Sequence, residues 1–221
     1  MKMGPDYRAE HTLTDGTRVL VRHIKPDDAD ELRRAFARLS PASRYRRFFG
    51  GVGALSEETL RYLTDVDGVN HVAFIAGMIS PDLKTETGLG VGRFIRSTED
   101  PAVAEAAVTV VDDAQRKGLG RLLLMTLADA ARERGVERFR ADVLASNAPM
   151  LRMLEEVGAI VIAGGGSHDA RSTLTFDVVL GEAGRDGGSG DGAHALARLL
   201  REAASSMAIL IRRLAPVGSP D

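Results

Sequence analysis

The chain lacks cysteine, has almost no net charge and shows no long apolar run at its N-terminus. Without cysteine there can be no disulfide bridge, no zinc site with thiolate ligands and no covalent catalysis by a thiolate. The 29 basic and 31 acidic side chains leave a formal charge of −2, which argues against a dedicated nucleic-acid binder. The polar N-terminus has no apolar stretch long enough for a secretory signal, so we expect a cytoplasmic protein.

Histidine is also sparse, and a metal site is not expected. The five histidines are scattered along the chain without the paired carboxylate spacing of metal ligands. What the chain does have is 44% hydrophobic residues over 221 positions, enough for one full core. We expect a catalytic domain over 1–180, a glycine-rich linker over 181–192, and an amphipathic helix and tail over 193–221.

Hydrophobic periodicity and turn residues predict an α/β fold with a mixed sheet. An Asp15-Gly16 turn between apolar runs indicates a hairpin over 12–24. Helices are expected after Pro26, at Ser40-Pro41 and at Ser56, with Tyr45, Phe48 and Phe49 in the core. Three strands over 71–79, 89–95 and 103–111 should form an antiparallel meander. We then expect a helix over 118–134 capped by Gly135, a strand over 139–144, a helix from Asn147, and strands over 159–163 and 173–180.

One turn in the sequence is suited to binding a phosphate group. It follows the strand that ends near Val110 and contains Gln115-Arg-Lys-Gly118-Leu-Gly120-Arg. The two glycines let the backbone bring several N–H groups close to an anion at a helix N-terminus, where the helix dipole is positive. Neither the G-x-G-x-x-G of dinucleotide-binding folds nor the G-x-x-x-x-G-K-S/T of P-loops is present. The turn therefore predicts a different nucleotide-type cofactor site.

The order of these segments resembles the GNAT superfamily of acetyl-CoA-dependent N-acetyltransferases. That family places a valine, four residues and then Q/R-x-x-G-x-G/A after a strand, and here Val110 precedes Gln115-Arg-Lys-Gly-Leu-Gly120 with this spacing. A segment beginning at Asn147 follows about thirty residues later. The resemblance implies a GNAT fold with a central mixed antiparallel and parallel sheet, splayed at the acetyl-CoA site and flanked by helices. It also implies acetyl-CoA as co-substrate.

Within the superfamily, the chain is similar to the bacterial Pat-type protein lysine acetyltransferases over roughly residues 10 to 180. The similarity rests on three segments, Ser40 to Phe49, Asp67 to Ala73 and Ala104 to Gln115. Glu105 matches the position of the proposed catalytic glutamate, thirteen residues before Gly118, and interrupts an apolar strand. An attacking lysine must be neutral, so a base is needed, and the resemblance assigns this role to Glu105. The other reading is that Glu105 lies at a strand end and is solvated.

The resemblance also assigns residues to the cofactor site. The pantetheine arm is expected to pair as an added strand with backbone groups of Val108, Val110 and Val111. Amides of the turn should hold the pyrophosphate, and these belong to Gln115, Arg116, Lys117, Gly118, Leu119, Gly120 and Arg121. Asn147 either caps its helix or binds the pantetheine. Many superfamily members place a tyrosine, the general acid, where this chain has Leu154, so we assign no general acid.

The C-terminal segment needs a partner for its apolar stripe. Large aliphatic residues recur at helical spacing between Leu196 and Leu214. They can pack on their own domain, pair with a second chain as a homodimer, or contact a membrane surface. Without aromatic anchors, the membrane option is the weakest and no membrane partner is expected.

Three functional classes remain open at this level. The first is acetyl transfer to a protein lysine, and the second is the same chemistry on a small amine, because fold and cofactor motif do not fix the acceptor. The third is a non-catalytic regulator that binds acyl-CoA.

Overall fold

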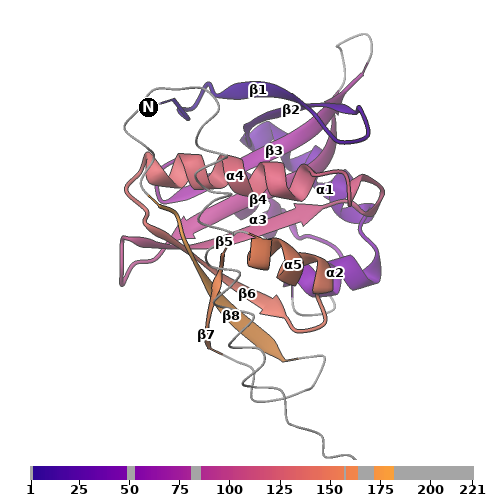
Figure 1. Ribbon diagram of the computed structural model, residues 1–221. Coiled ribbons are helices and arrows are strands. Elements are labelled where there is room, and N and C mark those ends of the chain that lie inside the picture. Colours follow the sequence, from indigo (N-terminus) through magenta and orange to yellow (C-terminus); the bar gives the residue numbers. More distant parts are fainter. Residues whose placement is uncertain (1, 49–52, 81–85, 157, 164–171, 182–221) are drawn as a thin grey trace, which may run out of the picture. The chain divides into compact units, whose positions relative to one another are not determined.

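Figure 1 shows a computed structural model of the protein, which describes residues 2–48, 53–80, 86–156, 158–163 and 172–181. The chain divides into two compact units, Met1–Ala141 and Asp142–Asp221. We describe each unit by itself. The linker and helix expected over 181–192 and 193–221 lie outside the described residues, apart from Gly181.

A mixed sheet forms the centre of the first unit. Its strands are β1 (Arg8–Thr12), β2 (Arg18–His23), β3 (His71–Ile79), β4 (Glu86–Arg96), β5 (Val103–Val110) and β6 (Arg138–Leu144), side by side in this order. The first five pair antiparallel, and β6, which runs across the division between the units, pairs parallel to β5. The expected meander and mixed sheet are therefore confirmed. The hairpin around Asp15-Gly16 is also present, but its first strand is Arg8–Thr12 and lies almost entirely before the expected range 12–24.

Helices cover both faces of this sheet (Figure 1). One face carries α1 (Ala29–Ala37), α2 (Pro41–Phe48) and α3 (Glu57–Thr64), and the other carries α4 (Leu119–Arg132). Ser56 starts α3 by accepting a hydrogen bond from the Thr59 amide at 3.1 Å, as its sequence position predicts. The apolar stripe of α4 is buried at Leu119, Leu123 and Leu127. Helix α4 ends before Gly135, whose φ of 74° is in the left-handed region.

Glycines in β4 let α4 approach the sheet closely. A Cβ on Gly90 would lie 2.9 Å from the Thr109 carbonyl oxygen and 3.1 Å from a methyl group of Leu123. A Cβ on Gly92 would lie 2.9 Å from a methyl group of Leu127. The helix therefore rests on backbone, not on side chains, where it crosses this strand.

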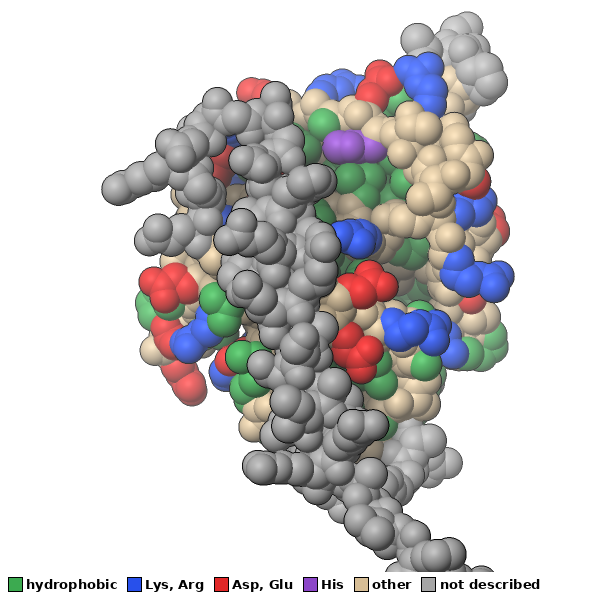
Figure 2. Space-filling view, in the orientation of Figure 1, with side chains coloured by type: hydrophobic (Ala, Val, Ile, Leu, Met, Phe, Trp, Pro, Cys, Tyr) green, Lys and Arg blue, Asp and Glu red, His purple; other side chains and the backbone are tan. Residues whose placement is uncertain are grey.

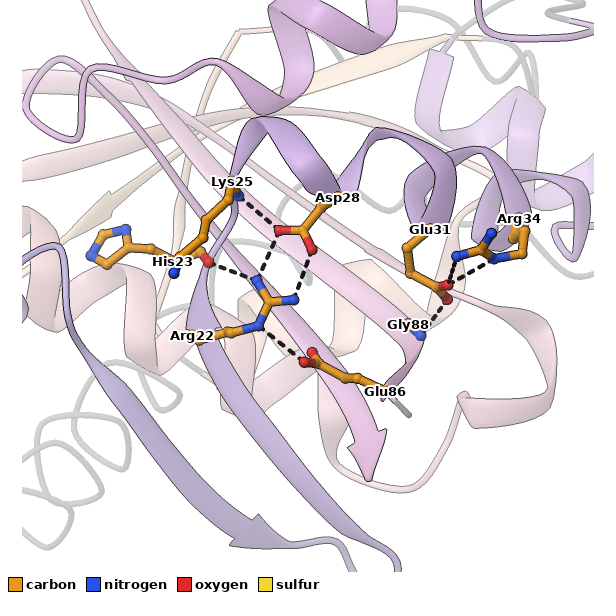
Figure 3. Close-up of polar contacts among 8 residues, drawn as sticks. All are labelled: Arg22, His23, Lys25, Asp28, Glu31, Arg34, Glu86 and Gly88. Carbon is orange, nitrogen blue, oxygen red and sulfur yellow. Dashed lines mark hydrogen bonds and ion pairs between the residues drawn. The ribbon is translucent and has the colours of Figure 1, made fainter. Parts of the chain in front are cut away.

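An ion-pair network fixes the start of α1 against the sheet (Figure 3). The Arg22 guanidinium binds both carboxylate oxygens of Asp28, at 2.8 and 2.7 Å, and one oxygen of Glu86 at 3.0 Å. Asp28, only 8% exposed, also accepts from the Lys25 amide at 2.7 Å. Farther along α1, Glu31 accepts from the Gly88 amide at 2.6 Å. The helix is thus attached to both β2 and β4 by charged hydrogen bonds.

The face that carries α4 has acidic and basic side chains interspersed (Figure 2). It shows no field of a single sign where it is described, in keeping with the near-neutral composition. Within the described residues, no helix combines the length and apolar character needed to cross a membrane.

The second unit contains α5 (Ala148–Glu156), β7 (Ile160–Ala163) and β8 (Thr173–Val179), with β7 and β8 antiparallel. The helix and the two strands predicted here are present. Beside them, Asp142 at the end of β6 accepts a hydrogen bond from the Thr175 hydroxyl at 2.7 Å.

One expectation about the core is wrong. Tyr45 is 38% exposed, while Phe48 is partly buried against Phe36 with ring centroids 5.6 Å apart. Helix α2 is only eight residues long, and the face that it buries holds Ser43 and Phe48. An aromatic run on so short a helix cannot turn every ring toward the sheet. Phe49 lies outside the described residues.

Candidate active site

The predicted phosphate turn has the backbone geometry of an anion site. Gly118 is the N-cap of α4, with φ of 86° and no side-chain cap. Arg116, with φ of 61°, is the one non-glycine residue in the described part of the chain that has a positive φ. Left-handed residues in such a turn point successive N–H groups toward one point. The uncapped amides at the start of α4 add to them, so the turn can receive a negatively charged group.

The β1–β2 hairpin supports this turn from one side. The Thr14 amide donates to the Lys117 carbonyl oxygen at 3.2 Å, and the Lys117 ammonium lies 3.0 Å from the Asp15 carboxylate. A hydrogen bond from the Thr17 amide, together with the Lys117 ammonium, lowers the pKa of Asp15 to about 2. Lys117 is therefore paired with a carboxylate, and the charge of the turn is smaller than its sequence indicates.

The connection between α1 and α2 supports the turn from the other side. Asp112 accepts from the Ser40 amide at 2.8 Å and from the hydroxyls of Ser40 and Ser43 at 2.9 Å. Burial alone would raise the pKa of Asp112, but these hydrogen bonds outweigh it and the pKa is lowered. The next residue, Asp113, binds Arg38 at 2.8 and 2.9 Å. The predicted Gln115 donates to the Val110 carbonyl oxygen at 3.0 Å.

Strand β5 leaves one edge unpaired beyond Glu105. Among the described residues, its pairing with β6 covers Val103 to Glu105 and stops, while its pairing with β4 continues to Val110. We call this unpaired edge of β5, which leads to the turn, the opening. Backbone groups that alternate along β5 point toward this opening, ready to bind an extended chain of amides.

The register identifies which backbone groups face the opening. Val111 donates its N–H to the Leu89 carbonyl oxygen at 2.9 Å, so it points toward β4, and its own oxygen accepts from the Ala114 amide at 3.0 Å. By alternation, Val108 and Val110 point away from β4. Because Gln115 occupies the Val110 oxygen, the opening offers both backbone groups of Val108 and the N–H of Val110. Geometry does not support a role for the Val111 amide.

Glu105 is exposed on β5, opposite Ile95 on β4. Since the side chain is exposed, the energetic cost of a buried charge is no argument that Glu105 is the catalytic base. Its position on the strand is more informative, because Glu105, Ala107 and Thr109 share one face by the period of two. That face is the one covered by α1, α2 and α3, and Ala107 and Thr109 line a cavity there. Glu105 thus lies on the strand next to a recess.

Asn147 belongs to the second unit and stands just before α5. Its side-chain oxygen accepts from the Met150 amide at 3.4 Å, and its carbonyl oxygen accepts from the amides of Met150 and Leu151 at 3.0 Å. The side chain therefore has the position of a helix cap. Leu154 is buried in the same unit at 2% exposure.

Two kinds of residue at this site could not be recognised as such from the motifs: those that support the turn, and the buried Arg93 at the cavity. Ser40, Ser43 and Asp15 bind the turn or its entrance through contacts across many residues of chain, which no local motif announces. Arg93 is buried at 6% exposure on the cavity face of β4. A signal for Arg93 was available, because it is a charged residue within an otherwise apolar strand.

The chain is similar in sequence to a family of known proteins and to individual members of it. The sequence pattern of the acetyltransferase (GNAT) family matches residues 28–159. An acetyltransferase of Pseudomonas aeruginosa is 34% identical over 139 residues, which is 63% of this chain and 73% of that protein. The acetyltransferase Pat of Mycolicibacterium smegmatis is 32% identical over 144 residues, which is 63% of this chain but only 40% of that protein.

A solved structure matches the fold closely. The GNAT domain of PAT from S. lividans has a TM-score of 0.66 and 30% sequence identity, with 77% of this chain and 96% of that domain covered. The range that the family pattern matches, 28–159, contains both the turn and Glu105.

Proposed function

Since the chain belongs to the GNAT family of acetyltransferases, we propose that it transfers the acetyl group of acetyl-CoA to a protein lysine. The observation that carries this proposal is the uncapped, left-handed turn at the start of α4 beside the unpaired edge of β5. Pyrophosphate oxygens would accept from amides over Gln115 to Arg121, and the pantetheine amides would pair with Val108 and Val110. The lysine acceptor follows from the similarity to proteins named Pat and PAT.

The chemistry needs one base and no covalent enzyme intermediate. The neutral amine attacks the thioester carbonyl, a C–N bond forms, and the C–S bond breaks as the CoA thiolate leaves. The amine loses one proton, and Glu105 is the group that we propose accepts it, directly or through a water molecule. Its exposure on the cavity face of β5 leaves it accessible to an acceptor that approaches from solvent. The departing thiolate takes up a proton from solvent.

A substitution that removes the base tests this assignment. Glu105→Gln should lower turnover by about two to four powers of ten and leave the affinity for acetyl-CoA unchanged. Glu99→Gln, which changes another exposed acid in the connection between β4 and β5, serves as the matched control and should turn over normally. The measurements are release of free CoA and the mass of a lysine peptide after incubation with the full chain. Equal pH–rate profiles for the wild type and Glu105→Gln would remove Glu105 from the mechanism.

The acceptor class is tested separately. Full-length protein, acetyl-CoA and two acceptors, a folded protein and a small primary amine, are compared by kcat/KM. Modification of the small amine alone would replace the lysine proposal with the second candidate, acetylation of a small molecule. Binding of acetyl-CoA without turnover on either acceptor would favour the regulator.

A further inference from the structure

A small cavity lies between the sheet and the helices α1, α2 and α3, on the face opposite α4. Its volume is about 50 Å³. A site for one water molecule needs about 10–15 Å³ by this measure, so the cavity is several times larger than a single water site. Most of the wall is apolar, but two guanidinium groups also line it. The lining includes Leu32, Phe36, Val91 and Ala107 together with Arg47 and Arg93.

Arg93 is a charged group that the fold buries without an opposite charge. It reaches the cavity from β4 at 6% exposure. It donates to the Leu63 carbonyl oxygen at 3.1 Å and to Nε2 of His71 at 3.0 Å. A guanidinium has five N–H donors and no acceptor, so these two bonds leave some of its N–H groups available to another acceptor. Because Arg93 is the donor in the bond to His71, Nε2 of His71 carries no proton. In the described part of the chain, no carboxylate lies within ion-pair distance of Arg93.

Arg47 brings a second cation to the same cavity from α2. Its guanidinium lies 5.1 Å from the ring centre of Phe48, and no carboxylate of the described residues pairs with it. Burial lowers the pKa of Arg47. Burial first, and then the charge of Arg47, lower the pKa of Arg93 to about 10. The charged form of each arginine is therefore destabilised by burial, and that of Arg93 also by the charge of Arg47. An anion bound between the two guanidinium groups would offset this destabilisation.

We propose that this cavity binds a carboxylate group on a short apolar segment, through Arg47 and Arg93. The planar forks of the two guanidinium groups match the two oxygens of a carboxylate, and the apolar wall receives the methylene next to it. The mostly apolar lining favours a carboxylate on a hydrocarbon segment over phosphate, because all four oxygens of a phosphate need polar partners. The cavity is a built site, because the charged group at its base is buried and held in place by Leu63 and His71.

The position of the cavity connects the carboxylate to the reaction. Ala107, which lines the cavity, and Glu105 follow each other on one face of β5, about 7 Å apart at the rise of a strand. Resting on the proposed function, the carboxylate then belongs to a reactant of the transfer. It is either a carboxylate near the amine of the acceptor or the distal carboxylate of a dicarboxylic acyl group on CoA. Both sources present the same chemistry to the two arginines.

The first experiment measures binding without acyl-CoA, so that it does not depend on catalysis. Full-length protein labelled with nitrogen-15 in its arginine side chains is titrated with butyrate, with butyramide and with inorganic phosphate. Butyrate should shift two guanidinium signals, while the uncharged amide of the same shape should not. Arg47→Gln should weaken butyrate binding about tenfold or more, since it removes a charged hydrogen bond. Arg46→Gln, on the same helix but outside the cavity wall, is the matched control and should bind normally.

A second variant keeps the test informative if the buried position tolerates change poorly. Arg93→Lys retains the charge but loses the fork, and it should bind butyrate with an affinity between those of the wild type and Arg47→Gln. Equal shifts by butyrate and butyramide, or unchanged binding in Arg47→Gln, would overturn the proposal. Binding of phosphate alone would also overturn it.

The second experiment identifies the source of the carboxylate. One arm compares acetyl-CoA turnover on an amino acid and on its amide, and the other compares succinyl-CoA with acetyl-CoA on a lysine peptide. A preference of about tenfold that disappears in Arg47→Gln assigns the carboxylate to the acceptor or to the acyl group, according to the arm in which it occurs. Butyrate binding with no transfer in either arm would leave the carboxylate site standing and refute the proposed function. Acetyl transfer without butyrate binding and without a preference for a carboxylate would support the proposed function and refute the carboxylate site.

Discussion

At the scale of single residues, backbone angle decides which side chain a position accepts. Gly118 and Gly135 both have positive φ, at 86° and 74°, and neither would bring an added Cβ within 3.4 Å of another atom. They differ only in place, because Gly118 belongs to the proposed cofactor turn and Gly135 follows the far end of α4. This pair separates the cost of strain from the cost of a lost binding site.

We expect Gly118→Val to weaken acetyl-CoA binding by more than about tenfold, because a β-branched residue cannot hold the left-handed angle that aims the amides of the turn. Gly135→Val is the control. Each variant should lose about 1–2 kcal/mol of unfolding free energy from strain, but only Gly118→Val should lose affinity. Calorimetric titration with acetyl-CoA and urea unfolding measure the two effects. Equal acetyl-CoA affinity in both folded variants would show that the turn does not bind the cofactor.

Single residues also show where sequence reasoning stops. Spacing alone located the turn over Gln115 to Gly120, because its glycines and the preceding strand are local. The sequence could not show that Lys117 is paired with Asp15 or that Val111 is turned toward β4, since these contacts depend on register between distant strands. Glu105 stands out through its position in the resemblance to Pat-type sequences and as a charge in an apolar strand, and Arg93 on the neighbouring strand shares the second of these signals.

At the scale of elements, the helices and strands were predictable and their attachments were not. Pro26, Ser56 and the Asp15-Gly16 turn are local signals, and the elements beside them occur where expected. The point at which β5 and β6 separate depends on two strands that are more than thirty residues apart, so no local pattern fixes it. The same holds for the ion pairs that join α1 to β2 and β4. These ion pairs hold α1, one of the three helices around the cavity, on the sheet.

Arg22→Met tests how much that attachment contributes. The substitution leaves Asp28 buried at 8% exposure without its cation, so the free energy of unfolding should fall by about 3–5 kcal/mol. Arg18→Met is the control on the same strand. Its partner Glu10 is exposed, and loss of this pair should cost at most about 1 kcal/mol. Both changes are measured by urea unfolding. Similar losses of unfolding free energy in the two variants would contradict the expectation that the buried pair contributes more than the exposed pair.

At the scale of the whole molecule, proton uptake couples stability to pH. Burial lowers the pKa of His23 and of His71, and the charge of Arg93 lowers that of His71 further. Both rings are therefore harder to protonate in the folded chain than in the unfolded chain, where the pKa is about 6.5. As the pH falls below that value, the unfolded chain takes up protons that the folded chain does not, and the balance moves toward unfolding.

We therefore expect the free energy of unfolding to be constant near pH 7.5 and to decrease from about pH 6.5 toward pH 5. Urea unfolding at several pH values measures this slope. His71→Gln should make the slope shallower, because one of the two rings is gone. A slope that is unchanged in His71→Gln, or stability that rises as the pH falls, would contradict this account.

The hydrogen bonds around the turn at Gln115 to Arg121 have a consequence for the timing of binding. Thr14, Asp15 and Ser43 hold the turn and its entrance through contacts made by the chain itself. The conformational entropy of this segment is thus lost during folding, and under the proposed function acetyl-CoA does not have to offset that loss when it binds. Association can then proceed as the docking of a flexible ligand into a rigid receptor. Differences in affinity among related thioesters should appear in how long each one stays rather than in how fast it arrives.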